Sequence, residues 1–167
     1  MEAVATDAIN EAEFLTLLEQ KPQPVDALLT RIRACAIRNE AKAAEWTLML
    51  TQELTDAADF AGLYLTFKER AGQLGPMLTN TGIRDALKKA TKDRLTAALI
   101  DSSDFDQNPL DAAFSRLDRL LALKPGTLVI DPAWGLGTVK RLDDFYKRVT
   151  VDFTGKPGHP IDRKSVV

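Results

Sequence analysis

The side chains best suited to catalysis are few in this chain. His159 is its only histidine and Cys35 its only cysteine. A nucleophile–histidine–carboxylate site would have to join His159 to Cys35 or to a distant serine, and no pattern brings these residues together. One histidine and one cysteine also fall short of a structural zinc site. We expect His159 to contact backbone or solvent at a loop or strand end. Cys35 should be a small core residue, with a reactive thiol as the alternative.

The remaining short motifs have structural explanations. Gly135-Leu-Gly137 is too short for a dinucleotide-binding fingerprint and leads into a predicted strand, whereas that fingerprint leads into a helix. The carboxylate pairs Asp56/Asp59 and Asp101/Asp104 are typical of helix caps and loops. The sequence therefore predicts no catalytic residues, no cofactor and no metal site, and we expect a protein that is not an enzyme.

Composition points to a globular protein with one helical domain and one small module. Of the 167 residues, 45% are hydrophobic and 28% are charged. The net charge of −2 combines −5 over residues 1–122 with +3 over residues 123–167. A basic tail fits contact with nucleic acid or an acidic protein, and equally an ordinary solvated surface. No signal peptide or membrane-length apolar run is visible, so we expect a cytoplasmic protein.

Residues 1–122 show helical periodicity and predict about six helices. Asn10 and Glu13 form a capping box for the first, and Pro24 should lie in the first turn of the second. Asn108 should cap the last, with Pro109 at its first position. The third helix is expected over residues 40–54. The fourth should begin at a cap formed by Thr55 or Asp56 and end near 72–75, and the fifth should span 83–100, followed by a loop at 101–107. This pattern predicts an all-α bundle or a short solenoid of helix pairs.

The periodicity changes to that of strands at Lys124-Pro125-Gly126. Strands are predicted over residues 127–131, 136–142 and 148–153. Short antiparallel strands in so short a segment should curl into a small barrel to cover their apolar face. The fold class is therefore α+β, with a helical domain at 1–122 and a small β-barrel at 123–167.

The connection between the first two strands carries the most information. Pro132 should end the first strand, and Gly135 and Gly137 should allow positive φ and a close backbone approach. Trp134 either closes the open end of the barrel or offers contact area to a partner. A basic rim, or simply a solvated strand face, is predicted from Lys140, Arg141, Lys147 and Arg148, with Lys156 and Arg163.

Two stretches of this region carry a family resemblance. They are KPGTLVIDPAWGLGTVK, from Lys124 to Lys140, and RVTVDFTGKPGH, from Arg148 to His159. They resemble the Tudor-like barrel of the CarD and transcription-repair coupling factor family, which binds the RNA polymerase β subunit, and the related barrel of UvrD-type helicases. Over nearly its whole length the chain is similar to the helical N-terminal extension and barrel of long GreA/GreB-family transcript cleavage and elongation factors.

The resemblance implies a non-catalytic interaction region of a Gre-like transcription elongation factor. Its barrel would dock a protein partner, RNA polymerase by the resemblance, through strand addition with Trp134 or Tyr146 as the anchor. The acidic coiled coil that acts in Gre factors has no counterpart, and Asp143-Asp144 is a short turn. We therefore expect the chain to be a fragment of a longer protein. The alternatives are a duplex nucleic-acid-binding module and a general helical scaffold whose barrel caps the stack.

Overall fold

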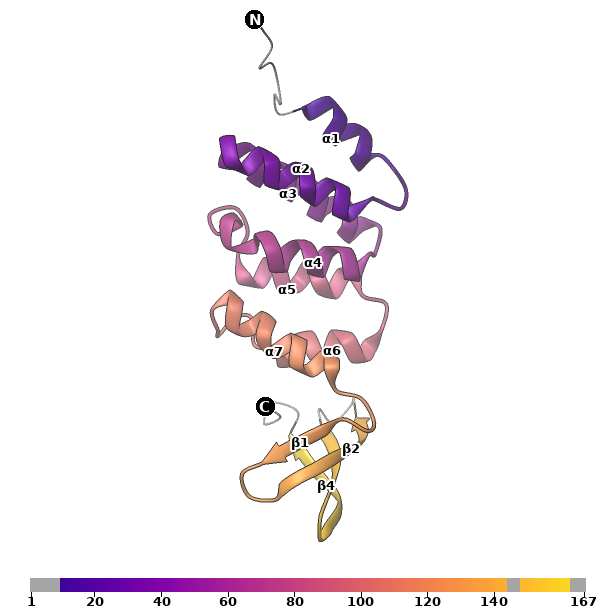
Figure 1. Ribbon diagram of the computed structural model, residues 1–167. Coiled ribbons are helices and arrows are strands. Elements are labelled where there is room, and N and C mark those ends of the chain that lie inside the picture. Colours follow the sequence, from indigo (N-terminus) through magenta and orange to yellow (C-terminus); the bar gives the residue numbers. More distant parts are fainter. Residues whose placement is uncertain (1–9, 144–147, 163–167) are drawn as a thin grey trace, which may run out of the picture. The chain divides into compact units, whose positions relative to one another are not determined.

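The computed structural model of the chain describes residues 10–143 and 148–162. It is an α+β structure in which helices are followed by a small antiparallel sheet (Figure 1). By its internal contacts the chain divides into two compact units, residues 1–79 and 80–167. The change from helix to strand lies within the second unit, between Ala122 and Leu128. The domain boundary at 122/123 stays a prediction.

Residues 10–79 of the first unit form four α-helices, each packed mainly against the next. Asn10 caps the first by accepting a hydrogen bond from the Glu13 amide, as the capping box predicts. The fourth is capped by Asp59, which accepts from the Gly62 amide, so the predicted cap at Thr55 or Asp56 is wrong. The elements are α1 (Glu11–Leu18), α2 (Val25–Arg38), α3 (Glu40–Asp56), α4 (Phe60–Arg70) and the 3-10 turn η1 (Ala71–Leu74).

An aromatic stack and a buried arginine join these helices. The Phe14 ring of α1 lies on the Trp46 ring of α3 with centroids 4.3 Å apart, and both side chains are buried. Arg70 of α4 is buried as well, and its guanidinium is paired with Glu40 and directed at the Thr47 hydroxyl of α3. Buried charge is tolerated because a partner accompanies it.

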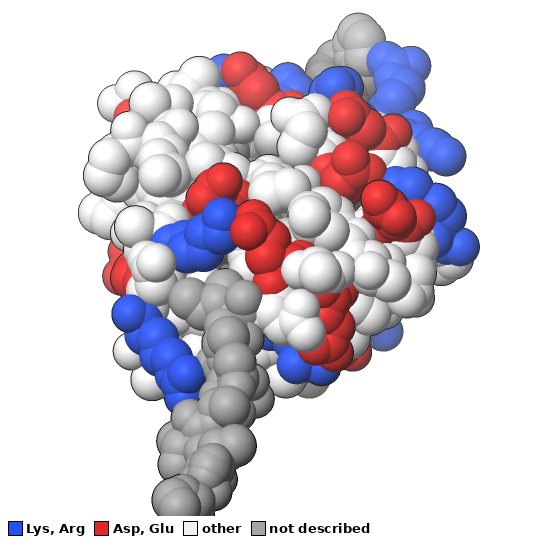
Figure 2. All heavy atoms as spheres, turned by 90° about the horizontal axis from the view of Figure 1, so that it is seen from above, with Lys and Arg blue, Asp and Glu red and all other residues white. Residues whose placement is uncertain are grey.

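The surface of the helices mixes charges of both signs. Figure 2 shows acidic and basic side chains as neighbours on the face that it presents. Two of the ion pairs are Lys42–Glu11 at 2.8 Å and Arg33–Glu69 at 2.5 Å. A surface of this kind favours solubility more than attraction to a polyanion.

The second unit begins with three α-helices where two were predicted. They are α5 (Asn80–Ala90), α6 (Arg94–Ser102) and α7 (Leu110–Ala122). The single helix expected over 83–100 is broken at 91–93, because the Asp93 side chain accepts the Leu95 and Thr96 amides and starts a new helix. Asn108 does not cap α7: its side-chain amide donates to the Asp104 carbonyl. Pro109 precedes the first helical residue.

The Asp93 cap predicts a pH-dependent contribution to stability. Hydrogen bonds from the Thr96 side chain and from the Thr96 and Leu95 amides lower the pKa of Asp93 below its usual 3.8. The cap therefore stabilises the fold fully at pH values above the pKa that Asp93 has in the unfolded chain. This stabilisation is lost as the pH falls through the lower pKa that Asp93 has in the folded protein. We expect Asp93→Ala to cost about 1 kcal/mol near neutral pH. Asp93→Asn should keep the cap without this pH dependence. Thermal denaturation of the unmodified chain and of the two variants, from neutral pH into the acid range, measures the cost of losing the cap and its pH dependence. Parallel profiles of stability against pH for the three proteins would contradict this account.

The sheet that follows is an antiparallel meander with the strand order β1-β2-β3-β4. Its strands are β1 (Leu128–Asp131), β2 (Gly135–Asp143), β3 (Arg148–Phe153) and β4 (Lys156–Asp162). The prediction of a closed barrel is wrong for the described residues, since β1 pairs only with β2 and β4 only with β3. Side chains that reach from the β1–β2 turn to β4 cover one end of the apolar face, so no β1–β4 ladder is needed there.

The strand β4 was not predicted. Pro157, Gly158 and Pro160 indicate a loop, but a strand that pairs on one side only tolerates proline, because the missing donor can face outward. Gly158, at φ +67°, lies where the β3–β4 register shifts, and its amide donates to Asp152 Oδ1. The lone histidine therefore lies within a strand.

Candidate docking surface

The turn that carries Trp134 is built by its neighbours. Asp131 Oδ1 accepts hydrogen bonds from the Ala133 and Trp134 amides at 2.7 and 3.0 Å, and Gly135 has φ +77°. The indole ring lies 5.0 Å from the His159 ring, and the Lys156 ammonium lies 3.9 Å above its centroid. Trp134 thus packs against β4, while 42% of its surface stays exposed. It covers one end of the sheet and still offers an exposed aromatic edge.

The inner face of the sheet is its hydrophobic core. Val139, Val149, Val151 and Phe153 are buried, and Gly137 lies directly opposite Phe153. A Cβ at Gly137 would lie 2.6 Å from atoms of Val151 and Phe153. The close approach predicted for this glycine is therefore present, and it leaves room for the Phe153 ring.

The outer face carries an exposed apolar patch, formed by Leu128, Ile130 and Leu136. Their exposed fractions are 67%, 76% and 57%. Ile130 and Leu136 are directly opposite each other in the β1–β2 ladder, and Leu128 is two residues from Ile130, so all three share one face. Sequence reasoning missed this patch. Its signal is the unbroken run Leu128-Val129-Ile130, which places apolar side chains on both faces of β1.

The basic residues of the predicted rim lie in different surroundings. Lys140 is the extra residue of a bulge between Val139 and Arg141 in β2, and Lys140 and Arg141 are exposed. Arg148 is exposed too, but its cross-strand partners are Asp143 and Asp162. Opposite charges at paired positions attract, so the charge of Arg148 is offset locally. Tyr146 and Lys147 lie outside the described residues.

The residues considered for catalysis lie apart in structural roles. Cys35 is buried in α2, where burial raises the pKa of its thiol. Asp59 caps a helix, and Asp101 is paired with Lys88 at 2.9 Å. Across residues 10–143 and 148–162, His, Cys, Asp and Glu nowhere gather in threes that could hold a metal ion. No helix in these ranges has the length and apolar character to cross a membrane.

Comparison with protein-family models, with curated proteins and with solved structures finds no match. The arguments for function therefore rest on the residues, their geometry and the sequence resemblance described above.

Proposed function

We propose that the chain is a non-catalytic interaction region whose sheet docks a protein partner by strand addition at β1. The observation that carries this proposal is a strand that, among the residues the structure describes, pairs on one side only and exposes Leu128 and Ile130. Strand addition gains affinity from main-chain hydrogen bonds and specificity from side chains at alternate positions. An exposed edge beside an apolar patch supplies both.

The family resemblance makes the proposal more specific. The two stretches that resemble the Tudor-like module are Lys124 to Lys140 and Arg148 to His159, and they span the turn of Trp134 and most of the four strands. We propose that the sheet is an open form of that module within a Gre-like transcription elongation factor, and that its partner is RNA polymerase. Trp134 is the proposed aromatic anchor, since part of its ring is exposed beside the sheet.

Nucleic-acid binding is the weaker proposal. Among the basic residues of the predicted rim that are described, Lys156 lies over the Trp134 ring and Arg148 lies opposite two aspartates. Duplex binding draws its affinity from several phosphate contacts by a continuous basic surface. The outer face of this sheet is mixed, with apolar side chains along β1.

Binding of purified bacterial RNA polymerase to immobilised full-length chain tests the proposal. Ile130→Lys places a charge on the docking edge, and we expect it to weaken binding about tenfold or more. Ile37→Lys is the matched control, because Ile37 on α2 is 86% exposed and lies outside the sheet. Circular dichroism verifies that both variants fold. The proposal fails if the unmodified chain does not bind the polymerase, or if Ile130→Lys binds as tightly as Ile37→Lys.

A further inference from the structure

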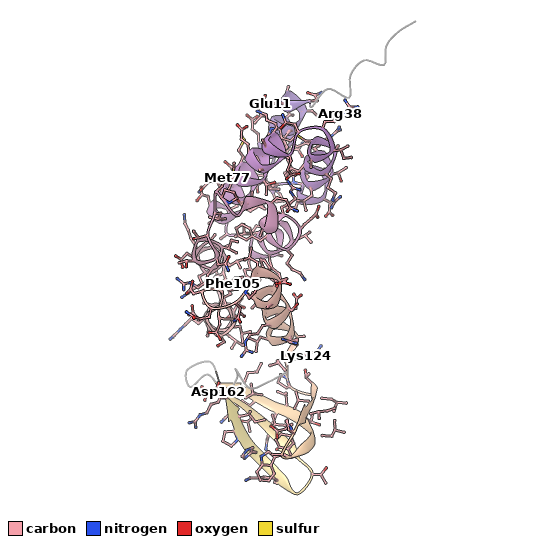
Figure 3. The ribbon with its side chains drawn as sticks, turned by 90° about the vertical axis from the view of Figure 1, so that its left-hand side faces the viewer. Glu11, Arg38, Met77, Phe105, Lys124 and Asp162 are labelled. Carbon is pink, nitrogen blue, oxygen red and sulfur yellow. The ribbon has the colours of Figure 1, made fainter. Side chains whose placement is uncertain are left out.

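We infer that the β1 edge accepts an extended segment that alternates apolar residues and ends in carboxylates beside Lys140 and Arg141. This inference rests on the proposed function and specifies the chemistry of the docked strand. It combines three features of the sheet. The outward backbone groups of β1 pair with no residue in 10–143 or 148–162, an apolar patch lies along the same edge, and the basic pair Lys140 and Arg141 lies next to the start of that strand. Figure 3 shows the side chains of the sheet, with labels at Lys124, which precedes β1, and at Asp162, the last residue of β4.

The hydrogen-bond register shows which backbone groups are available. The Val139 amide donates to the Thr127 carbonyl, and the Gly126 amide donates to the Val139 carbonyl, each at 2.8 Å. Thr127 therefore faces β2. Since backbone direction alternates along an antiparallel strand, Leu128 and Ile130 direct their N–H and C=O groups to the open edge. An added strand would pair with these two residues.

The apolar patch lies along the same edge. Leu128 and Ile130 project their side chains from the outer face, and Leu136 extends the patch onto β2. A docked strand presents every second side chain to that face. Apolar residues at alternate positions would cover Leu128 and Ile130, which are the most exposed large apolar residues of the sheet.

The basic pair lies at one end of this edge. β1 begins at Leu128, opposite Thr138, so Lys140 of β2 lies beyond the first residue of β1. No ion pair engages Lys140 or Arg141 within the part of the chain that the structure describes. Asp152, which lies opposite Thr138 of β2, accepts a hydrogen bond from the Gly158 amide. The basic pair is therefore available to carboxylates from a partner.

Strand direction fixes where those carboxylates belong. Antiparallel pairing continues the existing ladder and is slightly more stable per residue than parallel pairing. In that direction the C-terminal end of the added strand lies beside Gly126 and the basic pair. The preferred segment thus has alternating apolar residues followed by acidic ones. A polyphosphate backbone fits less well, because it offers nothing to cover Leu128 and Ile130.

Fluorescence anisotropy with the full-length chain tests this assignment. The first labelled peptide alternates valine and threonine and ends in two glutamates; in the second, glutamine replaces the glutamates, and in the third they stand at the N-terminal end. We expect the first peptide to bind about tenfold more tightly than either of the others at low salt. The double variant Lys140→Gln/Arg141→Gln should remove this preference and leave the affinity for the glutamine peptide unchanged. Lys92→Gln/Arg94→Gln makes the same change of charge outside the sheet and should retain the preference.

The outcomes separate this inference from the proposed function. Equal binding of the glutamate and glutamine peptides overturns the acidic specificity and leaves docking at β1 standing. Binding of none of the peptides overturns the inference, while the polymerase experiment with Ile130→Lys tests docking independently. A third outcome is that duplex DNA competes with the labelled peptide. If that competition is lost in Lys140→Gln/Arg141→Gln but kept in Ile130→Lys, the basic pair binds nucleic acid, and the inference of an acidic peptide is overturned.

Discussion

Gly137→Ala is expected to destabilise the sheet by about 1–3 kcal/mol, the range typical of overpacking a well-packed core. The added methyl would lie 2.6 Å from atoms of both Val151 and Phe153. These two side chains are buried, so neither can move aside without displacing its neighbours. Hydrogen exchange of the Val139 and Val151 amides measures the effect, because it reports the opening of the sheet separately from that of the helices.

Gly72→Ala is the matched control for this substitution. A Cβ at Gly72 meets nothing within 4 Å, and its φ is not positive, so alanine fits there. We expect no loss of stability at that site, or a small gain from the reduced freedom of the unfolded chain. Unchanged exchange of the sheet amides in Gly137→Ala would contradict the packing of Phe153 over this glycine.

Trp46→Ala is expected to cost about 3–5 kcal/mol in the first unit, as for other buried aromatic residues cut back to alanine. The side chain is 2% exposed and stacks on Phe14 with the two rings 5° from parallel. Its loss leaves a cavity between α1 and α3 and removes the partner of the Phe14 ring. Hydrogen exchange of the Leu50 and Leu54 amides, on the same helix, gives the change in opening free energy.

Trp46→Phe tests the contribution of the aromatic ring separately from that of the indole N–H group. The indole Nε1 is buried and has no hydrogen-bond partner among the described residues. Phenylalanine keeps an aromatic face for Phe14 but is smaller than the indole, so we expect a cost of about 1–2 kcal/mol from the space left behind, well below that of alanine. Equal costs for the two variants would contradict the stabilising role given to the stacked aromatic ring.

Local signals in the sequence predicted most of the helices. The Asn10 capping box and the apolar stripes agree with α1, α2, α3 and α4, while Pro24 lies at the N-cap of α2, one residue before the first turn in which it was predicted. The break at 91–93 was missed because the apolar residues of α5 and α6 continue at helical spacing across it. One side chain, Asp93, decides it by accepting two amide hydrogens of the next turn. Propensity summed over a window cannot detect a single cap of this kind.

The sheet was harder to predict because its distinguishing features depend on register. The turn of Trp134, Gly135 and Gly137 could be inferred from residue types alone. The bulge at Lys140 could not, since it depends on how β2 aligns with β3. The same alignment decides that Leu128, Ile130 and Leu136 share the outer face and that Arg148 meets two aspartates. The open edge follows from which strands pair, and this is a property of the whole sheet rather than of any segment.

The unpaired edge of β1 also bears on how the protein behaves when concentrated. An exposed edge with aliphatic side chains can template the pairing of identical copies, which is the first step toward aggregation. Here β1 is four residues long, with Pro125 before it and Pro132 directly after it. Proline cannot donate to a ladder, so a second copy gains only a few hydrogen bonds before the edge ends. The same short strand limits the number of main-chain hydrogen bonds that any docked strand can form, so side-chain contacts must add to the affinity of a heterologous partner.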